Sequence, residues 1–137
     1  MDVLDADLRE RVGAAAVARL ATVRPDGRPH VVPITFALVG DTIVTAVDHK
    51  PKTTTSLQRL RNIEAHPAAS VLVDHYEEDW SRLWWARADG TAQAIHEGPS
   101  RQEAVERLVA KYEAYRRQAP RGPVIVLHVH RWAHWSG

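Results

Sequence analysis

The chain has no cysteine, no long apolar run and almost no excess of either charge. Without cysteine it can form no disulfide, no thiolate metal site and no cysteine nucleophile. No apolar stretch approaches the roughly 20 residues that a membrane-spanning helix needs. Because 18 lysines and arginines balance 17 acidic residues, the overall charge favours neither nucleic acid nor an anionic membrane surface as a partner. Any anion site must therefore be local.

Several catalytic signatures are also missing. The sequence lacks the Gly-x-Ser-x-Gly elbow of serine hydrolases, the Walker loop of nucleotide triphosphatases and the Gly-x-Gly-x-x-Gly turn of dinucleotide-binding domains. The acidic stretch at residues 1–7 has no apolar core of the kind found in a secretory signal. We therefore expect a cytoplasmic protein outside these three enzyme classes.

The chain contains enough apolar residues for one folded domain, residues 1–137. At 45% hydrophobic residues it can bury a real core. Helical spacing predicts three helices, at residues 5–16, after a basic turn and up to about residue 65, and at 100–118. Period-2 alternation predicts six strands, at residues 17–24, 29–39, 42–48, 69–76, 83–95 and 124–132. Hairpins without regular βαβ alternation favour a mostly β fold, an antiparallel sheet or barrel with peripheral helices.

Three local signals refine this pattern. Pro33 lies inside the second predicted strand and cannot donate to a ladder, so it marks either an edge strand or an interruption. An interruption would leave backbone polar groups free for a ligand. Asp89 and Gly90 predict a bulge in the fifth strand. Ser100 and Glu103 have the spacing of a capping box at the start of the last helix.

The main candidate site is the stretch from residue 42 to residue 63. A β-branched strand leads into a cationic turn, and hydroxyl side chains follow at the start of a helix. The residues concerned are Lys50, Lys52, Thr53, Thr54 and Thr55. The free N–H groups and positive dipole end of a helix start, together with ammonium groups, suit a phosphate. The alternative is an ordinary helix cap beside solvated lysines.

Histidines near the end of the chain raise the question of a metal. His128 and His130 would share one face of the last strand, and His134 follows four residues later. A zinc site would need further ligands, and no acidic partner stands at a useful spacing. We therefore expect no metal.

The first predicted hairpin resembles a known family. Its motif follows the pattern Leu-Ala-Thr-x-x-x-x-Gly-x-Pro-His-x-x-Pro of pyridoxamine 5'-phosphate oxidase-like split β-barrel flavoproteins, here Leu20-Ala21-Thr22, Gly27, Pro29, His30 and Pro33. Three later segments are similar to an actinobacterial subgroup that depends on the deazaflavin coenzyme F420. These are residues 74–80, 83–85 and 131–135.

The resemblance implies a six-stranded antiparallel split β-barrel of the FMN-binding type. It implies a homodimer with two cofactor sites at the subunit interface. The cofactor phosphate would meet the basic turn, and the partner subunit would cover the ring with Trp80 or Trp85. The ring itself would lie against the second and third strands, around Val31, Pro33, Thr35, Thr45 and Val47.

By the same resemblance, the protein would be an oxidoreductase that transfers a hydride between reduced F420 and a small organic acceptor. A deazaflavin carries the hydride, so no side chain need act as a nucleophile and no catalytic residue is assigned. The alternatives are an FMN-dependent oxidoreductase and a non-catalytic F420 carrier. Four arginines are candidates for the glutamate tail of F420, namely Arg24, Arg28, Arg59 and Arg61.

Overall fold

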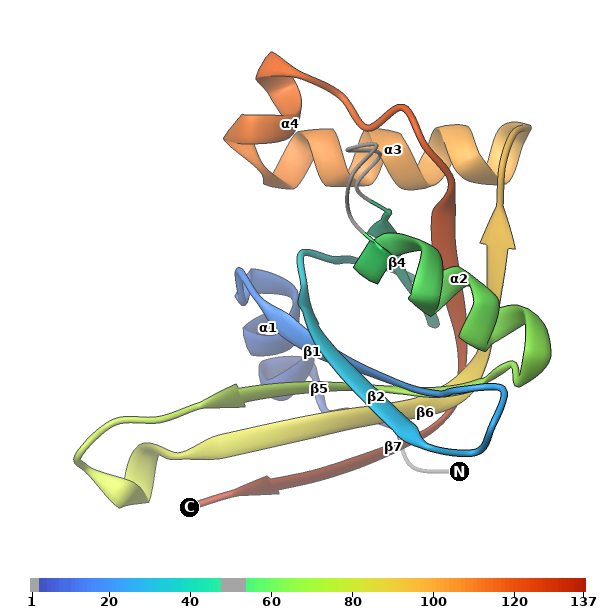
Figure 1. Cartoon of the computed structure of the whole chain (residues 1–137). Coiled ribbons are helices and arrows are strands. Elements are labelled where there is room, and N and C mark those ends of the chain that lie inside the picture. The colour runs from blue at the N-terminus through green and yellow to red at the C-terminus, as the bar shows by residue number, and fades with distance from the viewer. Residues whose placement is uncertain (1–2, 48–53) are drawn as a thin grey trace.

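One curved antiparallel sheet forms the wall of the molecule (Figure 1). The structure is a computed structural model that describes residues 3–47 and 54–137, and α2 side chains are described from residue 58 onward. Within these residues the sheet has seven strands in the order β2-β1-β5-β6-β7-β4-β3. They are β1 (Ala18–Val23), β2 (Pro29–Ile34), β3 (Ala37–Val39), β4 (Thr42–Ala46), β5 (Ala68–His75), β6 (Trp84–Ile95) and β7 (Val124–Ser136).

The helices lie around this sheet. They are α1 (Ala6–Ala14), α2 (Thr54–Ala65), α3 (Pro99–Lys111) and α4 (Glu113–Arg117), and a short 3-10 turn, η1 (Trp80–Arg82), joins β5 to β6. In Figure 1, α2 lies over the concave side of the sheet, while β5, β6 and β7 extend beyond it as an arm. None of the helices described is long and apolar enough to cross a membrane.

The predicted strand 29–39 is two strands, which explains why the sheet has seven strands instead of six. β2 ends at Ile34 and β3 begins at Ala37. Pro33 stays inside β2 opposite Arg19, and β2 is an edge strand, so the edge interpretation of this proline is the correct one. The interruption comes two residues later, at Thr35 and Phe36, which connect the two edge strands of the sheet.

The predicted bulge at Asp89 and Gly90 is confirmed. Asp89 pairs with Arg131 but Gly90 pairs with Val129, so β7 carries one extra residue at this point. A Cβ atom at position 90 would lie 2.0 Å from the carbonyl oxygen of His128. Only glycine allows the two backbones to approach this closely.

The predicted capping box at residues 100–103 is wrong. α3 begins at Pro99 after Gly98, whose φ of 99° sets the turn into the helix, and no side chain caps it. Proline favours the first helical position, so Ser100 already lies inside the first turn. The helix also ends earlier than predicted, because Tyr112 is extended and separates α3 from α4.

Two apolar cores lie on opposite faces of the sheet. The larger one fills the concave face, where strand residues such as Leu20, Val71 and Ala86 pack with α1 and with Ile63 of α2. The smaller one lies between the outer face and α3, and it contains Ala37, Val44, Val124, Val126, Ala104, Val105 and Leu108. The alternation of Val124 and Val126 with Ile125 and Leu127 assigns each strand residue to one core.

Candidate functional site

The structure contains the strand and the helix on either side of the basic turn that the sequence predicts as a phosphate site. β4 ends at Ala46 and α2 begins at Thr54. Lys50, Lys52 and Thr53 lie outside the described residues. Thr54 and Thr55 form the first turn of α2, and their side chains are not described.

Thr35 and Thr45, two of the residues predicted to lie against a cofactor ring, are hydrogen-bonded to each other. The Thr45 hydroxyl donates to the Thr35 carbonyl at 2.6 Å. Thr45 and Val47 are both 3% exposed. A ligand at this end of β4 would therefore contact their backbone, because their side chains are buried.

The sequence raised the possibility of free backbone polar groups at the break, but the Thr35 carbonyl and both backbone polar groups of Phe36 are hydrogen-bonded. Lys111 donates to the Phe36 carbonyl at 2.8 Å, and the Phe36 N–H donates to the Tyr112 hydroxyl at 3.1 Å. The hydroxyls of Thr35 and Tyr115 are 2.8 Å apart. Four side chains thus form a strand-break latch, namely Thr45, Lys111, Tyr112 and Tyr115.

Val31, Pro33 and Trp85 lie elsewhere, on the outer face of the sheet. Val31 is 60% exposed and Pro33 is also exposed. The pairing register continues this face across the sheet from Pro33 through Arg19 and Leu72. Trp85 lies on the same face, between Asp74 and Trp135. The predicted ring contacts are therefore divided between the strand break and this outer face.

A cationic corner has formed where the β1–β2 hairpin meets α2. His30 faces α2 from β2, and its Nδ1 atom is buried without a hydrogen-bond partner among the described residues. Burial, followed by the charges of Arg24 and Arg59, lowers the pKa of His30. Both guanidiniums therefore act on the same imidazole, and guanidinium groups are suited to binding carboxylates and phosphates. Of the four candidate arginines, these two converge.

The other two candidate arginines are placed differently. Arg28 lies in the exposed hairpin turn, 3.7 Å from Asp26. Arg61 lines a separate groove between α2 and β6. The sequence offered no signal to distinguish the converging pair, because Arg24 and Arg59 are distant in the chain and meet only through the packing of α2.

A buried hydrogen bond fixes that packing. Asn62 is fully buried, and its side-chain amide donates to the Thr22 hydroxyl at 3.0 Å. The side-chain amide of Gln58 donates to the side-chain oxygen Oδ1 of Asn62 at 2.7 Å. A buried amide that loses its partner is costly, so α2 is held in one register against β1. Sequence reasoning missed this pair.

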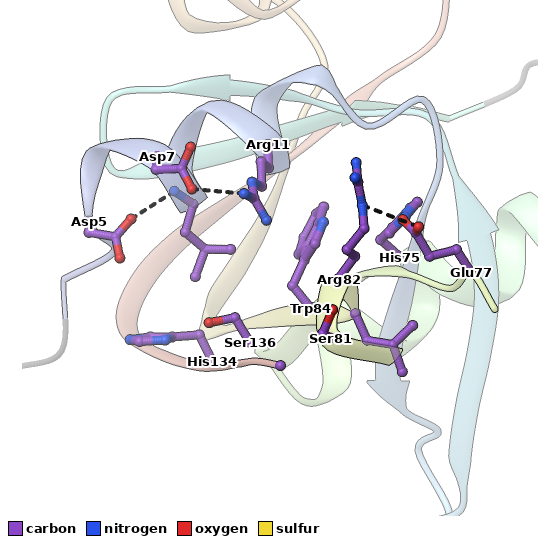
Figure 2. Close-up of a pocket in the computed structure, with 13 residues that line it drawn as sticks. Asp5, Asp7, Arg11, His75, Glu77, Ser81, Arg82, Trp84, His134 and Ser136 are labelled. Atoms are coloured by element: carbon purple, nitrogen blue, oxygen red, sulfur yellow. Dashed lines mark hydrogen bonds and ion pairs between the residues drawn. The ribbon is translucent and has the colours of Figure 1, made fainter. Parts of the chain in front are cut away.

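A second hollow, of about 700 Å³, lies between α1 and the arm (Figure 2). Arg11 reaches it from α1, Arg82 from η1, and Trp84 stands between them. Glu77 bonds to His75 at 2.5 Å and to Arg82 at 3.2 Å. Glu77 thus joins His75 and Arg82 in one wall of the hollow.

The charges of this hollow do not favour a phosphate. Its carboxylates, Asp5, Asp7 and Glu77, outnumber its guanidiniums, Arg11 and Arg82. Asp7 already pairs with Arg11 at 3.1 Å. No group of three or more metal-ligating side chains occurs in the part of the chain that the structure describes. This hollow is therefore less suited to an anion than the corner at His30, Arg24 and Arg59.

Comparison with known proteins decides the family. A family model described as pyridoxamine 5'-phosphate oxidase matches residues 4–136. The chain belongs to the pyridoxamine 5'-phosphate oxidase family. Membership confirms the split-barrel fold predicted from the hairpin motif, in a family that includes oxidoreductases. A search of curated proteins gives no match.

Solved structures agree on the fold of this pyridoxamine 5'-phosphate oxidase family member. The conserved hypothetical protein Rv2991 from Mycobacterium tuberculosis is 17% identical with a TM-score of 0.79, over 98% of this chain and 86% of that one. The heme storage protein HutZ from Vibrio cholerae is 16% identical with a TM-score of 0.75, over 97% and 94%. A candidate 5-nitroimidazole antibiotic resistance protein from Bacteroides thetaiotaomicron is 14% identical with a TM-score of 0.73, over 96% and 84%.

Proposed function

We propose that the protein is a homodimeric oxidoreductase that transfers a hydride between reduced coenzyme F420 and a small organic acceptor. The observation that carries this proposal is the convergence of Arg24 and Arg59 on the buried, unpartnered Nδ1 of His30. The family supplies the flavin-type fold. The cationic corner supplies a second place for negative charge beside the start of α2.

The residues present fit such a cofactor. Its phosphate would be held by Lys50 or Lys52 and the start of α2, where helix N–H groups favour anions. F420 also carries a carboxylate-bearing glutamate tail, which Arg24 and Arg59 would bind. FMN ends at its phosphate, so the cationic corner gives FMN no additional partner. Asn62 would keep Arg59 in place by locking α2 against Thr22.

The bound deazaflavin would supply the hydride, and the chain would position it. The strand-break latch fixes the backbone of Thr35 and Phe36 beside the end of β4. A rigid backbone can hold the polar edge of the ring in one orientation, and orientation lowers the barrier for transfer to an acceptor. Exclusion of water would fall to the partner subunit.

The outer face of the sheet would make the dimer. It exposes Val31, Leu72 and Trp135 together with charged residues, which is the mixture typical of an interface. Trp80 is 67% exposed at the end of the arm. In a dimer the arm would bring Trp80, or Trp85 from the same hairpin, over the ring of the partner site.

Two alternatives to an F420-dependent oxidoreductase are each supported by one of the comparisons. FMN is the cofactor that the family name suggests, and it would use the same phosphate site. Non-catalytic binding is the second, since HutZ, which shares the fold, is a heme storage protein. A carrier would bind its ligand tightly and leave the reduced form unreacted.

Titration of the purified protein with F420, FMN and hemin tests the proposal. We expect F420 to bind tightest and its reduced form to be oxidised by at least one enone or quinone acceptor. Arg24→Gln and Arg59→Gln should each weaken F420 binding about tenfold or more, the range for a hydrogen bond to a charged group. Arg28→Gln, in the exposed turn, is the matched control and should leave affinity unchanged. Tight FMN binding without F420 binding would overturn the choice of cofactor.

A further inference from the structure

The outer face over β1, β5 and β6 is hollow at one end and bulky at the other. At the hairpin end, beside the β1–β2 turn, lies a hollow of about 400 Å³. Many of its lining side chains are small, among them Ala21, Gly27, Ala68 and Ser70. At the arm end, by contrast, Tyr76 and Trp80 are 65% and 67% exposed. Space and bulk are therefore present on the same face but at opposite ends.

The hollow and the exposed aromatic side chains lie at equal distances from Leu72. Val71 and Val73 of β5 are buried in the concave core, so Leu72 points to the outer face, as do the residues at two-residue steps from it. Ala68 stands four residues before Leu72, and Tyr76 stands four residues after it. A rotation that reverses the strand about Leu72 therefore exchanges the positions of Ala68 and Tyr76.

Two copies of this face can pack together with their ends aligned or opposed. With aligned ends, the exposed aromatic side chains would hold the faces apart, and the two hollows would face each other as one void. Tightly packed surfaces tolerate neither voids nor excess bulk. With opposed ends, each hollow receives an aromatic side chain of the other copy, and a twofold axis makes the two contacts identical.

The charges differ between the two ends in a way that favours the same orientation. Residues 74–82 at the arm end carry four carboxylates and one guanidinium, whereas residues 24–28 at the hairpin end carry two guanidiniums and one carboxylate. No ion pair between described residues includes Asp74 or Glu78. Opposed ends bring the acidic end of one copy to the basic end of the other, whereas aligned ends bring like charges together.

We propose that this face binds a second copy of the chain with opposed ends, and that Tyr76 of each copy inserts into the hairpin-end hollow of the other. The inference rests on the homodimer proposed above and specifies its orientation. Asp89 lines the hollow, where it accepts hydrogen bonds from Ser70 and Arg87. A carboxylate can accept further bonds, so the hollow suits an aromatic side chain that ends in a hydroxyl.

The Tyr76 hydroxyl is available for such an exchange of partners. In the single chain it donates to the exposed Glu78 at 3.5 Å, and it accepts from the indole N–H of Trp80 at 3.5 Å. Both distances are at the long limit of a hydrogen bond, so neither bond holds the phenol strongly.

The contact makes the second copy part of the candidate site. Gly27 and Pro29 line the hollow, and they belong to the same hairpin as Arg24 and His30 of the cationic corner. Tyr76 of the second copy supports this hairpin from the outer face, while α2 packs against it on the concave face. Each cationic corner is therefore complete only in the dimer.

Cross-linking tests the orientation, because the chain has no cysteine of its own. Chains with Ser70→Cys and with Asp74→Cys are purified separately, mixed until subunits exchange, and treated with a bismaleimide of about 10 Å reach, the separation of packed sheets. Opposed ends place position 70 of one copy against position 74 of the other. Identical positions are then displaced by four residues, or about 13 Å along the strand, which puts them out of reach.

We therefore expect cross-linked dimers in the mixture and none in either variant alone. Cross-linking of the Ser70→Cys chain to itself, or no cross-linking in the mixture, overturns the proposal.

An exchange of side-chain size tests the insertion of Tyr76. Ala68→Tyr fills the hollow and Tyr76→Ala removes the aromatic group, so each variant should raise the dissociation constant of the proposed dimer about tenfold or more. In the double variant the bulk and the space have changed ends, so the two copies match again and the constant should return close to that of the native chain. Ala110→Tyr, at an exposed alanine of α3, is the matched control and should leave it unchanged. Losses that simply multiply in the double variant contradict the insertion.

These measurements distinguish the inference from the proposed function. Neither uses a cofactor, so a failure of the chain to bind F420 leaves both results unaffected. A protein that sediments as a monomer at every concentration overturns the orientation together with the proposed dimer. A dimer that cross-links only between identical positions overturns the orientation alone.

Discussion

The outer face of the sheet has two halves, and they differ in how far other parts of the chain cover them. Over β3, β4 and the start of β7, α3 covers small and β-branched side chains such as Ala37, Val44 and Val126. Over β2, β1, β5, β6 and the end of β7, no helix is present in the described structure. There Leu72 and Trp135 are exposed beside Arg19 and Arg87.

The two halves also differ in the composition of their side chains. The covered half is apolar because it is buried within the chain. The open half mixes apolar and charged side chains, so it can tolerate water when alone and still exclude it when paired with a second surface. On this open half Arg87 and Ser70 both donate hydrogen bonds to Asp89, which holds the carboxylate in one position.

The largest effect is expected in the covered half. Leu108→Ala removes a fully buried side chain from the small core and should lower the free energy of unfolding by about 2–5 kcal/mol. Urea unfolding measures it. Leu72→Ala, at a side chain 36% exposed on the open half, is the control and should cost less than about 1 kcal/mol in the dissociated protein. Equal losses would mean that the two halves are equally buried.

The second effect should appear only in self-association. Trp135→Ala removes a large aromatic side chain from the open half, and interface tryptophans often contribute about 2 kcal/mol or more. We expect the dissociation constant of the proposed dimer to rise by about 30-fold or more, measured by analytical ultracentrifugation. Val3→Ala, at a residue that precedes α1 and is 69% exposed, is the control. A dimer that is indifferent to Trp135 would place the interface elsewhere.

The third effect concerns the half-buried amine of Lys111, at the end of the helix α3 that covers this half of the sheet. Because the folded pKa of Lys111 lies near 8 and the unfolded value near 10.5, the unfolded chain binds more protons between these values. Stability should therefore rise as pH increases from about 8 to 10.5. Lys111→Met should remove this rise, as seen by comparing urea midpoints of the two proteins across that window. A rise that persists in the variant would assign it to other groups.

The smallest effect is expected on the open half. The hydrogen bond from Arg87, and then that from Ser70, lower the pKa of Asp89. A lowered carboxyl pKa gives stability that is present above the unfolded value and is lost as pH falls through the folded one. Asp89→Asn should cost about 1 kcal/mol or less at pH 7, as expected for a partly exposed pair, with the difference closing in acid. A cost that is independent of pH would exclude the ion pair as its source.

Much of the fold could be predicted because its signals are local. Strand alternation, the turns and the Asp89-Gly90 bulge each depend on neighbouring residues. The capping box failed for the same reason, since Pro99 one residue earlier already satisfies the helix start. Pro33 was ambiguous until the strand order was known, because an edge strand is a property of the sheet and not of the strand.

The candidate site was less predictable because it depends on distant contacts. The strand-break latch joins Thr35 to Tyr115 and Phe36 to Lys111, pairs far apart in the chain. The sequence suggested four arginines for an anionic tail, and only the packing of α2 distinguishes Arg24 and Arg59 from the others. The hollow beneath α1 had no sequence signal at all, since its walls come from both ends of the chain.

Gly90 affects the direction in which the arm formed by β5, β6 and β7 extends. Bulges strengthen the local twist, and this one lies where β7 stops pairing with β4 and β6 begins to pair with β5. The twist between these two parts of the β6–β7 pair therefore depends on a close approach between two backbones. A side chain at this position would force β6 and β7 apart. The resulting change in strand direction would displace the distant end of the β5–β6 hairpin. Changes at the tip would alter what the arm touches, whereas a change at Gly90 would alter where it points.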